Sequence, residues 1–157
     1  FITHINSKYK QKKKNINKII KLEKKYLLNL NKNLIKFKYN IQSSKKKLKK
    51  FINNKLKNKK NIHVYGASTK GNIILQFCGI KRNQIKFAAD RNHEKWGRET
   101  PGSKIPIISE KTSRMKKPDY YLVMPWHFKK EILKREKKFL KNGGQLIFPL
   151  PKLHIQS

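Results

Sequence analysis

The 157-residue chain is poor in cysteine, in acidic residues and in long hydrophobic runs. Its one cysteine, Cys78, excludes an intramolecular disulfide and a zinc site built from several cysteines. A reducing, cytoplasmic setting is the expectation for such a chain. Because no run of about 18 apolar residues is present, we expect neither a transmembrane helix nor a membrane partner.

The scarcity of acidic residues leaves a net charge of +33, from 41 basic and 8 acidic residues. This charge is typical of proteins that bind nucleic acids or anionic surfaces. However, 36 of the basic residues are lysine, and lysine, asparagine and isoleucine together make up 70 residues, all with codons rich in A and T. Arginine, the better reader of bases and phosphates, is scarce. We therefore interpret most lysines as solvated surface, and a lysine-rich nucleic-acid or anionic-surface binder remains the alternative function. Its affinity would fall steeply with salt.

Residues 1–61 contain no glycine and no proline, and Glu23 is their only acidic residue among 21 lysines. Apolar residues recur there every seven positions, at Ile20, Leu27, Leu34, Ile41 and Leu48. This spacing predicts one long or two shorter amphipathic helices between about residues 15 and 58, with Ser43-Ser44 as a candidate cap of the second. We expect residues 1–60 to form a lysine-rich helical connector. Packing on its own domain is favoured over a free coiled-coil dimer, since the seam is short and broken.

The remainder of the chain alternates strand and helix signals. Short apolar strands are expected at residues 62–65, 85–89, 105–108, 120–124 and 146–148. Helices are expected at 69–78, 109–115 and 127–141, the first with Ile73, Ile74 and Phe77 on its apolar face and the last ended by Asn142-Gly143-Gly144. This alternation predicts an α/β domain over residues 61–157, a small Rossmann-like parallel sheet with helices on both faces.

Polar residues follow three of the expected strands, where an open parallel sheet binds its ligands. They are the segments 66–72, 90–92 and 125–127. In the first, Ser68 or Thr69 can cap the following helix, whose free N–H groups, together with Lys70, favour an anion. The spacing fits neither the dinucleotide nor the ATP fingerprint. From these residues alone, two interpretations of the segment 66–72 stay open: a site for a phosphate-bearing ligand and a structural turn.

The other two segments also leave alternatives. Asp90 stands where dinucleotide folds place an acid for a ribose, but a helix cap or a salt bridge with Arg91 explains it equally well. His127 is open to a role as an acid, a base or a hydrogen-bond donor, and a cap of its helix is the alternative. His63 and Cys78 are expected to be structural. No nucleophile–base pair and no metal cluster can be read from the spacing.

A series of motifs over residues 60–152 resembles the C-terminal domain of the S-adenosylmethionine-dependent C-methyltransferases that act on nucleotide-linked deoxyketosugars. The motifs, in order, are Tyr65-Gly66-Ala67-Ser68-Thr69-Lys70-Gly71-Asn72, Phe77-Cys78-Gly79-Ile80, Ala89-Asp90-Arg91-Asn92, Lys95-Trp96-Gly97, Thr100-Pro101-Gly102, Lys117-Pro118-Asp119-Tyr120, Pro125-Trp126-His127-Phe128 and Phe148-Pro149-Leu150-Pro151. Two positions depart from the family pattern, since Ile73 replaces its usual threonine and His93 its usual proline.

The resemblance implies that the chain is a fragment, because full-length members also have an N-terminal zinc domain and a central domain. The central domain binds S-adenosylmethionine and carries a catalytic Tyr-His-Glu-His motif, which is absent here. The expected partners are this missing central domain and a nucleotide-diphosphate sugar, and the chain alone is expected to be inactive. The expected substrate-binding residues are Ser68, Lys70, Asn72, Asp90, Arg91 and His127.

Overall fold

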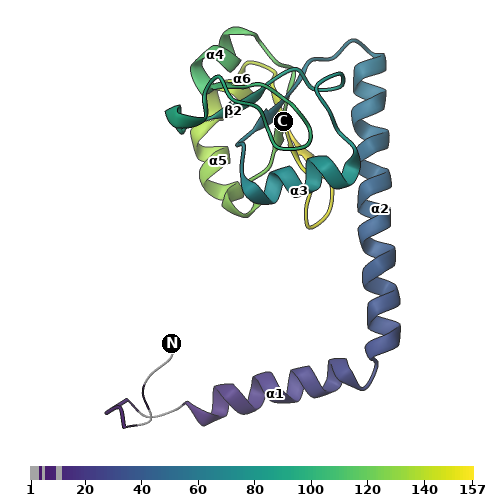
Figure 1. Ribbon diagram of the computed structural model, residues 1–157, viewed down its shortest axis with the longest axis vertical. Helices are drawn as coiled ribbons and strands as arrows, with labels where there is room; N and C mark the ends of the chain where they lie inside the picture. The colour runs from purple at the N-terminus through teal and green to yellow at the C-terminus, as the bar shows by residue number, and fades with distance from the viewer. Residues whose placement is uncertain (1–3, 5, 10–11) are drawn as a thin grey trace. The chain divides into compact units, whose positions relative to one another are not determined.

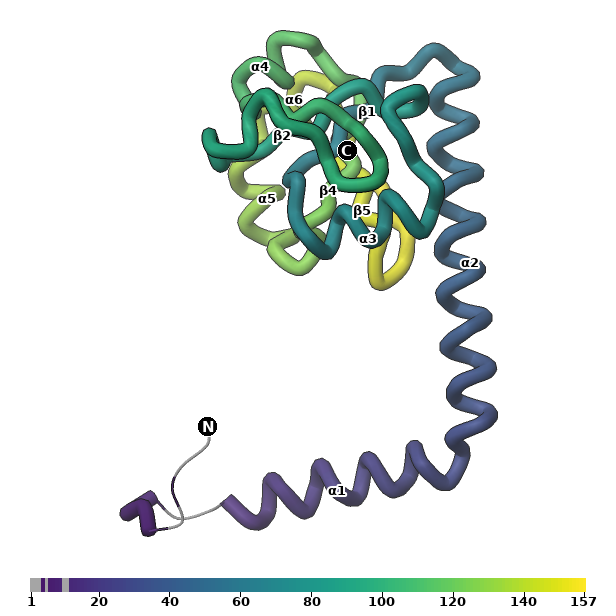
Figure 2. The backbone as a smooth tube through the Cα atoms, in the orientation of Figure 1, coloured from purple at the N-terminus to yellow at the C-terminus, as the bar shows by residue number. Residues whose placement is uncertain are grey.

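The computed structural model describes residue 4, residues 6–9 and residues 12–157. The described chain forms two compact units, the first reaching Ile41 and the second covering Gln42–Ser157. Figure 1 labels the helices and strands, and Figure 2 traces the backbone through them. None of the helices in the described part of the chain is long and apolar enough to cross a membrane.

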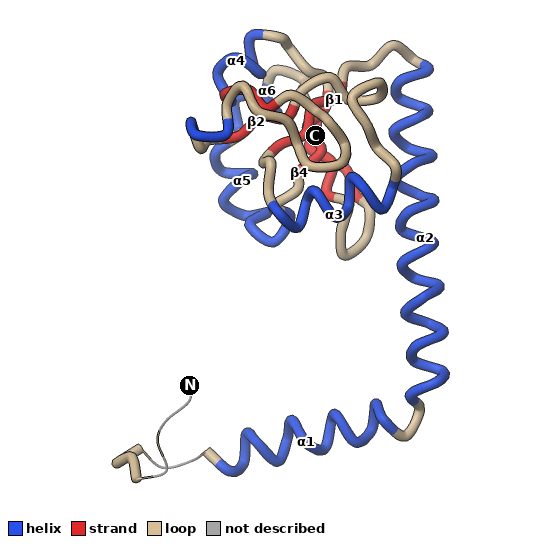
Figure 3. Tube along the Cα trace, in the orientation of Figure 1, coloured by secondary structure: helices blue, strands red, loops and turns tan. Residues whose placement is uncertain are grey.

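Two helices account for the lysine-rich half of the chain, as its apolar spacing predicts. The helix α1 spans Lys13–Leu27 and α2 spans Leu30–Lys57; Figure 3 shows both as blue segments. The break lies at Leu28 and Asn29, where asparagine is a poor helix former. The expected cap at Ser43-Ser44 is wrong, because both serines lie inside α2. Within the second unit, Leu48 and Ile52 of α2 are buried against the sheet.

A six-stranded sheet forms the centre of the second unit, in the order β3-β2-β1-β4-β5-β6. The strands are β1 (Ile62–Tyr65), β2 (Ala88–Asp90), β3 (Ile107–Ser109), β4 (Tyr120–Val123), β5 (Gln145–Phe148) and β6 (His154–Gln156). The first five pair in parallel, which confirms the expected parallel sheet. The short β6 pairs antiparallel with β5 and was not expected, since three residues of mixed polarity give no strand pattern.

Helices cover both faces of this sheet, and each face has its own apolar core. On one face α2 and α3 (Thr69–Cys78) pack on Val64, Leu122 and Ile147. On the other, α5 (Lys129–Arg135) and α6 (Lys137–Lys141) pack on Tyr121 and Leu146. Figure 1 shows α2 and α5 on opposite sides of the strands. The remaining elements are α4 (Glu110–Met115) and the short 3₁₀ turns η1 (His93–Lys95) and η2 (Trp126–Phe128).

Two details of the helices differ from the expectation. The helix α3 buries Gly71, Leu75 and Cys78 against the sheet, whereas Ile73 and Phe77 are exposed. The expected single helix over residues 127–141 is divided into η2, α5 and α6, with a break at Glu136. Glu136 stands at this break, and its carboxylate bonds to the buried hydroxyl of Tyr65 and to Arg114.

Candidate functional site

The loop between β1 and α3 lies at the carboxyl edge of the sheet, as the sequence predicts. Gly66 begins it with a φ of +85°, and a Cβ there would lie 2.8 Å from Cδ of Pro125. Only glycine allows both the conformation and this close approach. Ser68 caps α3, because its Oγ accepts the N–H of Gly71 at 3.1 Å. A Cβ on Gly71 would lie 2.5 Å from Cβ of Met124, so this glycine lets α3 start directly beside the end of β4.

Asp90, at the end of β2, is bonded to its own chain. Its Oδ2 accepts the N–H of Ala67 at 2.7 Å and lies 3.3 Å from Nζ of Lys95, while Oδ1 accepts the N–H of Asn92 at 2.8 Å. Nζ of Lys95 also donates to the carbonyl of Ala67 at 3.1 Å. Asp90 and Lys95 therefore hold both polar groups of Ala67 and fix the loop before Ser68. The salt bridge with Arg91, one of the alternatives for Asp90, does not form, and Asp90 pairs with Lys95 instead.

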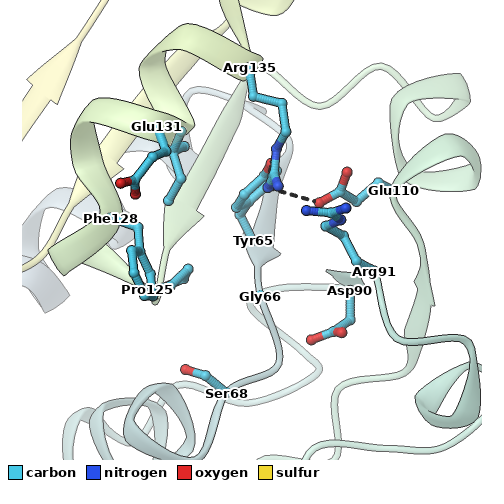
Figure 4. A pocket seen from close by; sticks show the side chains of 11 residues that line it. Tyr65, Gly66, Ser68, Asp90, Arg91, Glu110, Pro125, Phe128, Glu131 and Arg135 are labelled. Atoms are coloured by element: carbon cyan, nitrogen blue, oxygen red, sulfur yellow. Dashed lines mark hydrogen bonds and ion pairs between the residues drawn. The ribbon is translucent and has the colours of Figure 1, made fainter.

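A hollow of about 390 Å³, here called the carboxyl-edge pocket, opens beside this loop. It lies between the end of β1 and the starts of α4 and α5, where the strand order of the sheet reverses. Figure 4 shows Pro125 and Phe128 on one side of it and Asp90, Arg91 and Glu110 on the other. Its lining residues are Tyr65, Gly66, Ser68, Asp90, Arg91, Glu110, Pro125, Phe128, Glu131, Ile132 and Arg135.

A buried network of charged groups forms the wall behind the pocket. The hydroxyl of Tyr65 donates to Oε1 of Glu136 at 2.8 Å and accepts from Nε of Arg135 at 2.8 Å. Arg114 reaches the same Glu136 oxygen at 2.6 Å, and Glu110 joins Arg114 to Arg135 at 3.2 Å on each side. Glu136 is only 2% exposed. The network ties β1, α4 and the α5–α6 junction together.

The same network shifts the pKa values of Tyr65 and Arg114. Burial raises the pKa of Tyr65 well above its usual value, and the charge of Glu136 adds to this, although the bond from Arg135 acts in the opposite direction. Burial works against the charge of Arg114, but the bonds and charges of Glu136 and Glu110 outweigh it and raise its pKa. Tyr65 therefore remains a neutral phenol and Arg114 a cation over the working range of pH.

His63 lies in β1, deep in the interior on the α4 side. It is 1% exposed, and its Nδ1 lies 2.8 Å from Oγ of Ser113, which in turn lies 2.9 Å from the hydroxyl of Tyr121. Burial, together with the charge of Lys116, lowers the pKa of His63 to about 4. Cys78 is buried too, and burial raises the pKa of its thiol. Both residues are structural, as expected from the sequence.

The expected site residues divide into two groups. Ser68, Asp90 and Arg91 line the carboxyl-edge pocket. Lys70 and Asn72, on the first turn of α3, do not line it; Lys70 is exposed, and the buried Oδ1 of Asn72 has no partner among the described residues. His127, exposed in η2, is likewise outside the lining.

Sequence reasoning missed five further residues of the pocket that carry charge or an aromatic ring. They are Tyr65, Glu110, Phe128, Glu131 and Arg135. A signal was present for three of them, Glu110, Glu131 and Arg135, because acidic residues and arginines are exceptions to the lysine bias in a chain with 8 acidic residues and 5 arginines. These residues come together because the starts of α4 and α5 lie at the same edge of the sheet. Spacing along the chain does not show this arrangement.

The pocket does not fit S-adenosylmethionine. In dinucleotide-type folds, an acid at the end of the second strand holds a ribose through a free carboxylate. Here both oxygens of Asp90 are occupied by Ala67, Asn92 and Lys95. Ala67 N–H, which could face a ligand phosphate, is occupied by the same carboxylate. We therefore derive no step through this cofactor from the residues of this chain.

The order of the strands and the pocket at their carboxyl edge define a Rossmann-like domain. Comparison with known proteins gives its family. Residues 1–151 match the family described as C-methyltransferase C-terminal domain, so the chain belongs to that family. It is also 42% identical over 98 residues to the C-methyltransferase NovU of Streptomyces niveus. This match covers 62% of the chain but only 23% of NovU, so the chain corresponds to about a quarter of that relative. The alternative of a nucleic-acid or anionic-surface binder gains no support from either match.

Proposed function

We propose that this chain is the substrate-side domain of an S-adenosylmethionine-dependent C-methyltransferase that acts on a nucleotide-linked deoxyketosugar in the cytoplasm. The methyl donor and the catalytic groups then belong to a separate central domain, with zinc held by a further N-terminal one. The observation that carries the proposal is the carboxyl-edge pocket, which lies at the reversal point of a parallel sheet in a chain of this family. Ligands of such sheets bind at that point.

In this proposal the β1–α3 loop holds the diphosphate. The first turn of α3 directs N–H groups outward, and the helix dipole favours an anion there. Oγ of Ser68 accepts a hydrogen bond from the N–H of Gly71 and so fixes the start of the helix. The exposed Lys70 adds a positive charge beside it. Asn72 lies two residues further on, still in the first turn of the same helix.

The remaining expected residues have separate parts in the same proposal. Arg91 lines the pocket, and no side-chain partner of its guanidinium is present among the described residues, so it is free to contact the substrate. Asp90 shapes the site by holding the loop. His127 is a polar contact at the rim, on the turn that follows β4. The proposal assigns no proton transfer and no methyl transfer to this chain; its residues bind and orient the substrate.

Lys70→Ala is expected to weaken substrate binding about tenfold or more in a full-length C-methyltransferase that carries this domain. A hydrogen bond to a charged group contributes roughly 1.5–3 kcal/mol, and about 1.4 kcal/mol equals a factor of ten. Ser68→Ala is expected to weaken substrate binding less, since it removes a short polar contact and no charge. It also removes the cap of α3. The Michaelis constant for the sugar nucleotide measures the effect.

The control for this experiment is Lys81→Ala, an exposed lysine beyond the C-terminal end of α3. It removes the same charge and is expected to leave the Michaelis constant unchanged. Affinity for S-adenosylmethionine is expected to be the same in all variants, because its site lies in another domain. A folded Lys70→Ala enzyme with an unaltered Michaelis constant would reduce the β1–α3 loop to a structural turn.

A further inference from the structure

The lining of the carboxyl-edge pocket differs in charge from the rest of the chain. The chain has 36 lysines, yet none of them lines the pocket. Three of its 8 acidic residues do, namely Asp90, Glu110 and Glu131. Against these stand Arg91 and Arg135, which gives the lining a net charge of −1 in a chain of +33. A biased codon usage that favours lysine everywhere does not produce such an exception.

Most of these charged groups already have partners within the chain. Arg135 bonds to Tyr65 and Glu110, and Asp90 bonds within its own loop. No side-chain partner of Arg91 or Glu131 is present within the described residues. The groups left to meet a ligand are therefore one guanidinium and one carboxylate. A diphosphate placed here would meet Arg91 but also the unpaired carboxylate of Glu131, which repels it.

The two sides of the pocket differ in polarity. Pro125, Phe128 and Ile132 form an apolar side at the end of β4 and the start of α5. Asp90, Arg91 and Glu110 lie across from Pro125 and Phe128, from the ends of β2 and β3 (Figure 4). A ring with a flat apolar face and hydroxyl or N–H donors at its edge suits this lining, because aromatic rings pack on apolar faces and the unpaired carboxylate of Glu131, on the same side as Phe128 in Figure 4, accepts hydrogen bonds. The volume of about 390 Å³ suits one such ring.

Resting on the proposed function, we infer that this pocket binds the uncharged, hydrogen-bond-donating ring at one end of the nucleotide sugar and excludes its diphosphate. The ring is either the sugar or the nucleoside, since both have donors at the edge. The diphosphate then lies at the Ser68 edge of the pocket and extends toward Lys70, which is outside the lining. Glu131 accepts from the ring and Phe128 packs on it, so these two residues determine specificity at this site.

The test follows the backbone amides of the 157-residue chain by nuclear magnetic resonance at physiological salt. The probes are dTDP-glucose, dTDP, glucose 1-phosphate and inorganic pyrophosphate. We expect dTDP-glucose to shift the amides of Gly66, Asp90 and Ile132, and pyrophosphate to shift only amides near Ser68 and Lys70. A shift of the pocket amides by dTDP identifies the nucleoside as the bound ring, and a shift by glucose 1-phosphate identifies the sugar.

A charge reversal with a matched control makes the test specific. Glu131→Lys and Glu94→Lys change the net charge equally, but Glu94 is an exposed residue of η1 outside the lining. We expect Glu131→Lys to weaken dTDP-glucose binding about fivefold or more, a loss of about 1 kcal/mol, and to admit pyrophosphate to the pocket, whereas Glu94→Lys does neither. Equal responses of the two variants, or pocket shifts by pyrophosphate in the unaltered chain, would overturn the inference. Failure of dTDP-glucose to shift any amide of residues 62–157 would contradict the proposed function instead.

Discussion

Glu136→Ala is expected to lower the free energy of unfolding by about 3–4 kcal/mol. The carboxylate is 2% exposed and accepts from Tyr65 and Arg114, with Arg135 3.7 Å away. Its removal leaves a buried phenol without its acceptor and takes the shared partner from two guanidinium groups. The cost falls in the lower part of the range for broken buried ion pairs, because the side chains of Arg114 and Arg135 remain 40% and 38% exposed and can be solvated.

Urea unfolding followed by circular dichroism measures this loss as a lower midpoint at unchanged slope. Glu131→Ala is the matched control, since Glu131 lies five residues earlier, is exposed and has no side-chain partner in the part of the chain that the structure describes. Its effect is expected to stay within about 0.5 kcal/mol. Equal midpoints for the two variants would show that the network behind the pocket contributes nothing to the fold.

The second large effect concerns the buried His63. Its pKa of about 4 in the folded state lies below the value of 6.5 for an exposed histidine, so as the pH falls the unfolded chain binds the proton first. The contribution of neutral His63 is therefore complete above pH 6.5 and is lost progressively toward pH 4. The free energy of unfolding is expected to decrease by about 3 kcal/mol over this interval, at about 1.4 kcal/mol per pKa unit.

His63→Phe separates this effect from other titrations. Phenylalanine keeps an aromatic ring beside Phe87 and Tyr121, and Ser113 keeps its contact with Tyr121. The variant is expected to lose about 3 kcal/mol less than the unaltered chain between pH 7 and pH 4. The control His127→Phe, at an exposed position, is expected to follow the unaltered chain. Parallel pH profiles of the free energy of unfolding for all three proteins would contradict the assignment of this loss to His63.

The sequence predicts those parts of the fold that depend on local pattern. Continuous apolar runs such as Tyr120–Val123 predict buried parallel strands, and Ser68 with Thr69 predicts the start of α3, where Ser68 is the residue that caps it. Features set by distant partners do not follow from the pattern. Glu136 reads as a surface residue of one helix, and its contact with Tyr65, 71 residues earlier, does not follow from the local pattern.

The candidate site divides in the same way. Strand ends place Ser68, Asp90 and Arg91 at one edge without any knowledge of the structure. The sequence does not show that Asp90 is already bonded to Ala67 and Lys95, because that depends on how two loops meet. For the same reason Glu131 and Phe128 were not expected, since α5 brings them to the pocket from another part of the chain.

Calorimetry on this chain with two ligands tests the central claim, that it forms the substrate side of a C-methyltransferase. We expect dTDP-glucose to give specific heat of binding and S-adenosylmethionine to give none, because the carboxylate suited to a ribose is already occupied by the protein's own groups. Binding of S-adenosylmethionine at about micromolar affinity, worth about 8 kcal/mol, would contradict the claim and place the methyl donor in this domain.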